Sequence, residues 1–189
     1  MSVVTTDEEG YWIGGNSEPL TVIRCPTGDS ILDNGIFRRA FLQAKKDSWA
    51  DSLPFSRRRE VGGYAYFDST GIHVTRTEDP TKYSPCSVSY GYGSGAVLIF
   101  HVHPFNPPEG FTPADTLPTA VGCPVGQRYD VKMWGGPSTE DWHASITTGL
   151  PSYIIDKKRI YVTNPRVTDS TLWADSTKKY DWNTRKCRW

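Results

Sequence analysis

Two histidines, His101 and His103, stand one residue apart at the end of the most hydrophobic strand-like segment, residues 96–103. Residues i and i+2 of a β-strand point to the same face, so the two imidazoles would have Cα atoms roughly 6–7 Å apart. At that spacing both rings can bind one metal ion. Pro104 cannot donate to a strand ladder, which places the pair at a strand end beside an irregular loop. This pattern is typical of a catalytic metal centre.

A catalytic zinc site needs a third protein ligand and leaves a fourth position for water. Two aspartates stand in similar sequence contexts, Asp115 and Asp141. Ser138 can cap a helix in which Asp141 is the third residue, and this would hold the carboxylate at the helix start. A proline and a glycine soon after Asp115 leave little room for such a helix. Local physics favours Asp141 and keeps Asp115 as the alternative, although without the histidines a plain helix cap would be the preferred interpretation.

Hydrolysis at such a site also needs a group that accepts and donates a proton. Glu60 follows the basic run 57–59 and precedes two glycines at 62–63, which permit a close approach of the backbone. A surface glutamate paired with the neighbouring arginines would explain the same residue by itself. The assignment of Glu60 as the base therefore depends on the metal site.

Hydrophobic periodicity and turn residues predict the elements that would position these side chains. The predicted elements are helices at 34–49 and 138–148 and strands at 61–67, 72–76, 96–103, 152–156 and 159–163. Gly149 would end the second helix. The expected fold class is α+β, an α/β-type sandwich in which helices flank a mixed central sheet.

The elements indicate one domain over 34–164, preceded by an N-terminal extension at 1–33 and followed by a tryptophan-containing C-terminal extension at 165–189. We expect the tail to pack as an irregular or strand-like segment. Residues 105–137 are rich in proline and glycine and have no periodicity. A segment of that length without regular structure is unusual in a compact domain and is often functional.

The 189 residues include 21 basic and 21 acidic side chains, and this balance argues against binding to nucleic acid or to an anionic membrane. The N-terminus has no apolar stretch of the kind that signal peptides carry. We expect a soluble protein, either cytoplasmic or exported by a specialised secretion system. Four scattered cysteines would allow two disulfides and give no cysteine-ligated zinc pattern; they are Cys25, Cys86, Cys123 and Cys187.

Three segments in this order resemble the signature of the JAB/MPN superfamily of JAMM-type zinc metallopeptidases. They are Glu60-Val61-Gly62-Gly63-Tyr64, His101-x-His103-Pro104 and Ser138-x-x-Asp141. The resemblance covers roughly residues 34–163. Within the superfamily the chain is most similar to the bacterial JAB-like domains attached to RHS-type polymorphic toxins, which also have a G-x-P-S-x-x-D-W stretch, here residues 135–142.

The resemblance implies a JAB/MPN-like sheet and a Zn²⁺ ion held by His101, His103 and Asp141. Glu60 would be the general acid/base, acting through the water at the fourth position, and Ser138 would help to hold the oxyanion. Familiar members have a much shorter segment between the second histidine and the aspartate. The chain therefore either carries a large insertion at 105–137 or uses Asp115, with a threonine in place of the serine.

These matches imply a zinc-dependent metallopeptidase that hydrolyses a peptide or isopeptide bond, and the toxin likeness implies a secreted bacterial toxin or effector. Its substrate would be a peptide or protein, such as a ubiquitin-like conjugate or a cell-wall peptide, and an immunity or inhibitor protein would be a partner. The alternative is a catalytically inactive interaction module of the same fold. A nuclease or deaminase is disfavoured, because the chain has neither a basic surplus nor a cysteine-rich zinc site.

Overall fold

The computed structural model describes residues 27–48, 58–76, 91–103, 136–156 and 159–181 in full. Four short strands are described by their backbone alone and pair as two small antiparallel sheets: β1 (Thr5–Thr6) with β2 (Trp12–Ile13), and β9 (Asn183–Thr184) with β10 (Cys187–Arg188). The predictions for Asp115, for residues 105–135 and for cysteine pairing lie outside the described residues.

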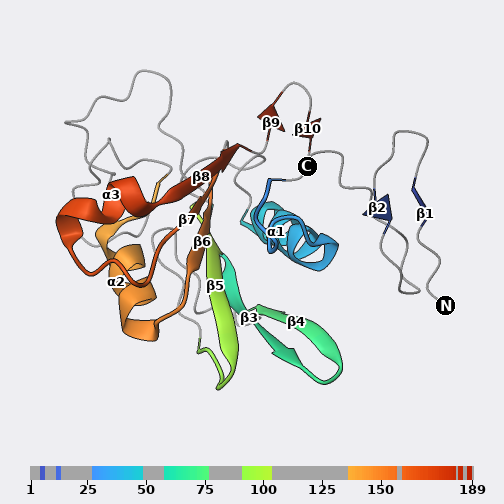
Figure 1. Ribbon diagram of the computed structural model, residues 1–189, viewed down its shortest axis with the longest axis horizontal. Coiled ribbons are helices and arrows are strands. Elements are labelled where there is room, and N and C mark those ends of the chain that lie inside the picture. Colours follow the sequence, from blue (N-terminus) through green and yellow to red (C-terminus); the bar gives the residue numbers. More distant parts are fainter. Residues whose placement is uncertain are drawn as a thin grey trace.

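A six-stranded mixed sheet in the order β4-β3-β5-β6-β7-β8 forms the centre of the fold (Figure 1). Its strands are β3 (Gly62–Asp68), β4 (Gly71–Arg76), β5 (Ala96–Val102), β6 (Ser152–Ile155), β7 (Arg159–Val162) and β8 (Lys178–Asp181). Only β5 and β6 run parallel, and the chain passes through a helix between them, as parallel neighbours require. The predicted α+β class and the five predicted strands of this sheet are confirmed.

Helices lie on both sides of the sheet (Figure 1). The helix α1 (Gly35–Asp47) covers one face, and α2 (Thr139–Thr148) lies with the short α3 (Trp173–Ser176) on the other. The helix α2 ends at Gly149, whose φ of 70° is the left-handed conformation that glycine adopts readily. Both predicted helices and the predicted stop are confirmed. None of the helices in the described residues combines the length and apolar character needed to cross a bilayer.

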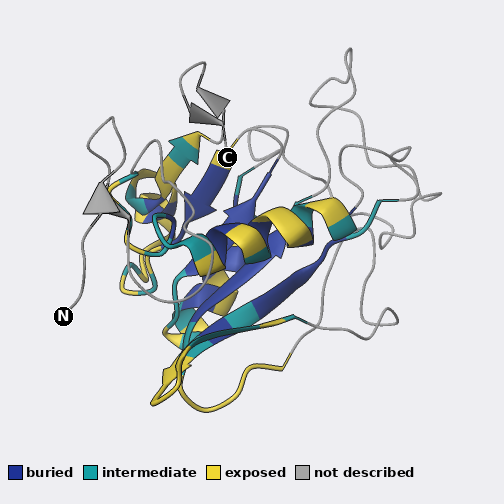
Figure 2. Ribbon diagram, turned by 90° about the vertical axis from the view of Figure 1, so that its right-hand side faces the viewer, coloured by how far each residue is buried: buried dark blue, intermediate teal, exposed yellow. Residues whose placement is uncertain are grey.

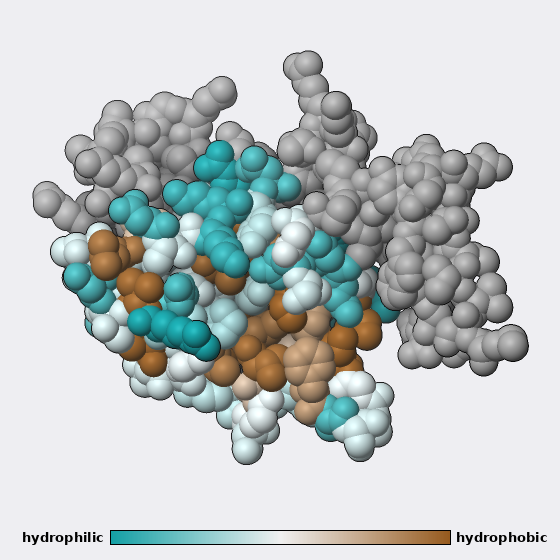
Figure 3. Space-filling view, viewed as in Figure 1, coloured by the Kyte–Doolittle hydropathy of each residue, from teal (hydrophilic) through white to brown (hydrophobic). Residues whose placement is uncertain are grey.

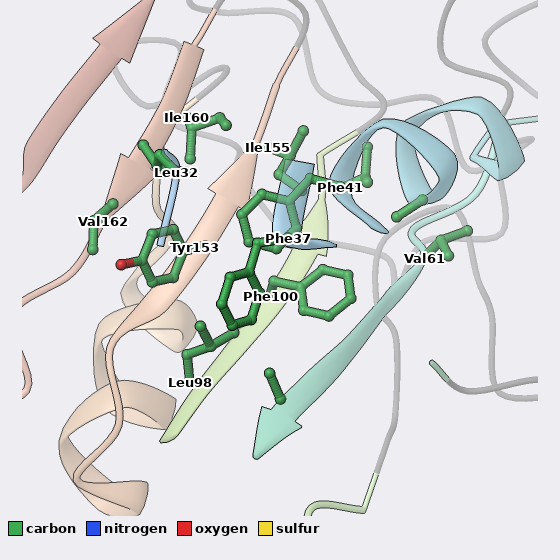
Figure 4. Packing of buried hydrophobic residues seen from close by; sticks show 13 residues of the cluster. Leu32, Phe37, Phe41, Val61, Leu98, Phe100, Tyr153, Ile155, Ile160 and Val162 are labelled. Carbon is green, nitrogen blue, oxygen red and sulfur yellow. The ribbon is translucent and has the colours of Figure 1, made fainter. Parts of the chain in front are cut away.

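The main hydrophobic core lies between α1 and the sheet (Figure 4). Phe41 of α1 packs against Phe100 of β5 and Tyr153 of β6, with ring centroids 5.0 and 5.7 Å apart. Figure 2 shows this core from another side: buried and exposed residues alternate along α1, and the central strands are buried. Burying one such side chain contributes roughly 1.5–3 kcal/mol. Since Phe100 points to the α1 face, the adjacent His101 points to the opposite face.

Apolar side chains also reach the surface where α1 meets the hairpin of β3 and β4 (Figure 3). The exposed ring of Phe67 lies edge-on to Phe37 of α1, with centroids 6.5 Å apart. This contact lies on the α1 face and therefore on the side of the sheet away from His101.

The strand β4 approaches β3 so closely that residue 63 must be glycine. A Cβ atom on Gly63 would lie 2.1 Å from the backbone oxygen of Thr75, well inside van der Waals contact. The prediction that the glycine pair permits a close backbone approach is therefore confirmed for Gly63. Its neighbour Gly62 pairs with His101 of β5, so these two residues share a sheet face.

The sheet continues beyond residue 164, because β8 pairs with β7 as an edge strand. The strand-like part of the tail was predicted. A 3₁₀ turn at Ser170–Leu172 and the helix α3 were not, since both are too short for a periodic pattern. The chain before α1 also joins the core, where Leu32 is fully buried and Asp29 accepts hydrogen bonds from the hydroxyls of Tyr153 and Tyr180.

Candidate metal centre

The two histidines lie at the end of β5, on the face that carries α2. His101 is buried and pairs with Gly62 on β3 and with Ile154 on β6, while His103 follows the last strand residue. The peptide N–H of His103 donates to the carbonyl of Ile155 at 2.8 Å, so the backbone remains tied to the sheet. The rings point the same way, as the strand period predicted, with centroids 4.8 Å apart.

The start of α2 brings Asp141 to the histidines. The Nε2 atoms of His101 and His103 are 2.9 Å apart, and they lie 3.0 and 3.4 Å from Oδ1 and Oδ2 of Asp141 respectively. In a tetrahedral site with zinc–ligand distances of 2.0–2.1 Å, the donor atoms are roughly 3.3 Å apart. The three side chains are therefore arranged so that they could bind a metal ion.

A capping box at the beginning of α2 fixes the orientation of Asp141. The backbone N–H of Ser138 donates to Oδ2 of Asp141 at 2.6 Å, and the Ser138 hydroxyl accepts from the N–H of Asp141 at 3.2 Å. The second carboxylate oxygen remains directed at His101. The helix cap predicted for Ser138 and Asp141 is present, and it coexists with the contact to the histidines.

The backbone before α2 determines the tautomer of His103. Its Nδ1 lies 3.1 Å from the carbonyl oxygen of Gly136, and because a carbonyl can only accept, Nδ1 must carry the proton. In the neutral ring the lone pair is then on Nε2, the atom that faces His101 and Asp141. Histidines that bind metals are commonly oriented in this way.

The charges of the cluster favour a cation between the imidazoles. Burial by itself would lower the pKa of His101, but the charge and hydrogen bond of Asp141, with the charge of Glu60, raise it. Burial lowers the pKa of His103 to about 4. Burial would raise the pKa of Asp141, yet the two histidines and the Ser138 N–H hold it below its usual range. Asp141 thus remains ionised, and its negative charge stabilises positive charge at His101.

Glu60 lies just before β3 and is only 7% exposed. The ladder continues past Gly62, since the carbonyl of Val61 accepts from the N–H of Val102 at 2.9 Å. Glu60, two residues before Gly62, is therefore on the face that carries the histidines. Burial raises its pKa to about 8, against the lowering effect of His101, and Asp141 raises it further. A carboxyl with a pKa near neutral pH is suited to both accepting and donating a proton.

The structure thus brings together Glu60, His101, His103, Asp141 and Ser138, while Asp115 lies outside the described residues. The other two histidines are not in the cluster. His73 on β4 bonds to Asp68 and stacks on Tyr66, and the exposed His143 meets the edge of Trp173. Sequence reasoning missed the carbonyl of Gly136, because a backbone acceptor has no residue signature.

Comparison of the chain with protein-family models, with curated proteins and with solved structures finds no match. The geometry of this cluster and the sequence signature are therefore the features of the chain that indicate a function.

Proposed function

We propose that the chain is a zinc-dependent metallopeptidase of the JAB/MPN type, which hydrolyses a peptide or isopeptide bond. The observation that carries this proposal is the convergence of the three side chains: the two Nε2 atoms are 2.9 Å apart, and each lies 3.0 or 3.4 Å from an oxygen of the Asp141 carboxylate. Two imidazole nitrogens and one carboxylate oxygen are a donor set that zinc hydrolases use, and three protein ligands leave a position for the reacting groups. Zinc is preferred over magnesium or calcium, since those ions favour all-oxygen ligands.

The surrounding residues have suitable chemistry for this reaction. Zinc held by the three ligands would supply Lewis acidity, which lowers the pKa of a water molecule and polarises a carbonyl. Next to that positive charge the Glu60 carboxyl ionises more readily, so it can take the proton of the attacking water and pass it to the leaving amine. The hydroxyl of Ser138 uses its oxygen as an acceptor for Asp141, so its proton is available to the developing oxyanion.

The biological setting that we propose is that of a bacterial toxin or effector with an immunity protein as partner. This part of the proposal is supported by the G-x-P-S-x-x-D-W stretch at 135–142 and by the order of helix, hairpin, histidine strand and ligand helix. The stretch includes Gly136 and the capping box, so the matched residues are the ones that hold His103 and Asp141 in place.

Metal analysis of the purified protein tests the ligand set. We expect one zinc per chain in the wild type and in Asp115→Ala, and none in His101→Ala or Asp141→Ala. His73→Ala is the matched control, because it removes an imidazole that lies outside the cluster. A wild-type chain that takes up no zinc during dialysis would refute the proposal and would favour the inactive interaction module.

Cleavage assays test the role of Glu60. Wild-type protein and Glu60→Gln would be incubated with a peptide library, ubiquitin-like conjugates and muropeptides, and the products would be identified by mass spectrometry. We expect Glu60→Gln to retain its zinc and to lose hydrolysis. Equal cleavage by both proteins would exclude Glu60 as the proton carrier.

A further inference from the structure

The residue that follows Asp141 is anchored to the C-terminal segment. Trp142 is 6% exposed, and its indole stacks on Trp173 of α3, with ring centroids 5.3 Å apart and planes 26° apart. The neighbouring His143 meets the edge of the same Trp173 ring at 5.2 Å. The first turn of α2 therefore rests against one buried side chain of the C-terminal segment.

A directional chain of hydrogen bonds completes this contact. The indole N–H of Trp142 donates to the hydroxyl oxygen of Thr177 at 3.1 Å, and that hydroxyl donates to the carbonyl of Trp173 at 2.8 Å. The indole N–H of Trp173 donates in turn to the carbonyl of Val167 at 2.9 Å. Thr177 is thus used as an acceptor and as a donor, and valine could replace its shape but neither bond.

Thr177, which accepts the hydrogen bond from Trp142, is attached to the central sheet. Thr177 immediately precedes β8, which pairs with β7 along four residue pairs from Arg159–Asp181 to Val162–Lys178. Figure 1 shows α3 beside α2 on the face of the sheet that carries the site. The first turn of α2 consequently contacts the histidines through Asp141 and α3 through Trp142.

We infer that Trp142, Trp173 and Thr177 form a clamp that sets the position of Asp141 relative to the two histidines. These three are positioning residues of the metal site, and the inference rests on the proposed function. Asp141 lies 3.0 Å from His101 and 3.4 Å from His103, so a small rotation of the first helical turn would change both distances. The C-terminal segment is in this sense part of the metal centre.

Two substitutions of Thr177 distinguish a clamp from simple packing. Thr177→Val keeps the branched shape and loses both hydrogen bonds, whereas Thr177→Ser keeps the hydroxyl and loses a methyl group. If the hydroxyl positions Asp141, the valine variant is the impaired one. If the side chain only fills space, the serine variant is the impaired one.

Zinc affinity would be measured on chelator-stripped protein by competition with a chromophoric chelator. Loss of a group that orients a metal ligand typically weakens binding about 10–100-fold, so we expect about a 10-fold loss for Thr177→Val and near wild-type affinity for Thr177→Ser. The visible spectrum of the cobalt(II)-loaded protein should shift for Thr177→Val only. Thr148→Val is the matched control, because it removes a hydroxyl bonded to Ala144 at the other end of the same helix.

Urea unfolding of each metal-free variant shows whether it is folded under the conditions of the metal titration. Should Thr177→Val not fold, Trp173→Phe keeps an aromatic ring and removes the bond to Val167, and it should also weaken zinc binding. Wild-type affinity and an unchanged cobalt spectrum in the folded variants would overturn the clamp while leaving the metal site intact. A wild-type protein that binds neither ion would overturn the proposed function and the clamp together.

Discussion

Replacing Glu60 by glutamine should stabilise the metal-free protein at neutral pH and much less in acid. Glu60 is buried, and its pKa is raised from 4.5 to about 8. Between these two values the unfolded chain loses the proton of Glu60 while the folded chain retains it. The folded state then binds more protons, so the free energy of unfolding falls as the pH rises through this interval. Glutamine does not titrate, so the free energy of unfolding of Glu60→Gln does not include this decrease with pH.

The size of the effect follows from the two pKa values. One unit corresponds to about 1.4 kcal/mol, so linkage gives a cost of about 3 kcal/mol at pH 7 and of about 1 kcal/mol at pH 5. The advantage of Glu60→Gln should therefore grow by about 2–3 kcal/mol between these two pH values. Above the folded pKa of about 8 it should become constant, since both states are then ionised.

Urea denaturation of chelator-treated wild type and Glu60→Gln, measured at intervals from pH 5 to pH 8, would check this. Glu140→Gln is the matched control, because Glu140 is an exposed carboxylate in the first turn of α2. We expect this substitution at an exposed position to change the free energy of unfolding by less than about 0.5 kcal/mol. A difference between wild type and Glu60→Gln that stays flat over the same interval would contradict the assignment of Glu60 as a buried, protonated group.

Four further substitutions have defined outcomes. Gly63→Ala should cost about 3 kcal/mol or more in urea unfolding, or prevent folding, since its Cβ would lie 2.1 Å from a backbone oxygen of β4. Gly149→Ala should cost about 1–2 kcal/mol by the same assay, because φ is 70° and only the backbone is strained; no loss would argue against the left-handed cap. Phe100→Ala should cost about 3–5 kcal/mol, as its ring is fully buried. Gly62→Val should retain zinc, but its new side chain would share the face of His101 and should block a small ligand from reaching the metal. Acetohydroxamic acid, which chelates metal ions, should therefore change the spectrum of the cobalt-loaded wild type and leave that of Gly62→Val unchanged. The same spectral change in both proteins would show that ligands do not approach the metal over Gly62.

Local chemistry was sufficient to predict the helix that carries Asp141. Ser138 at the cap, Asp141 three residues later and Gly149 at the end each act through neighbours within one turn, so their signals are contained in the sequence. The same is true of the histidine pair, whose common direction follows from the two-residue period of a strand.

The convergence of Asp141 on the histidines could not be derived from local signals. It depends on the parallel pairing of β5 with β6, which places the start of α2 next to the end of the histidine strand. The sequence signature pointed to this contact by likeness alone. The burial that raises the pKa of Glu60 is equally non-local, because a surface glutamate beside arginines has the same sequence.

The C-terminal elements were predicted only as an irregular or strand-like tail, and the helix α3 and the position of β8 were missed. The helix α3 has four residues, too few to show a period, and β8 has the sequence Lys-Lys-Tyr-Asp, without alternating apolar residues. An edge strand with lysines is a common protection against unwanted pairing, and it conceals the strand from a hydrophobic pattern. The tryptophans of this polar tail indicated that it packs, and the structure buries Trp173.

The two faces of β5 link the stability of the fold to the geometry of the site. Leu98, Phe100 and Val102 are buried against α1, and the residues between and after them include His101 and His103 on the opposite face. A slip of β5 by one residue would exchange these faces and place the imidazoles in the apolar core. The packing of Phe100 on α1 therefore excludes the alternative register and decides where the histidines point. In this fold the hydrophobic core fixes the direction of the ligands, and the cap of α2 then has only to bring one carboxylate to them.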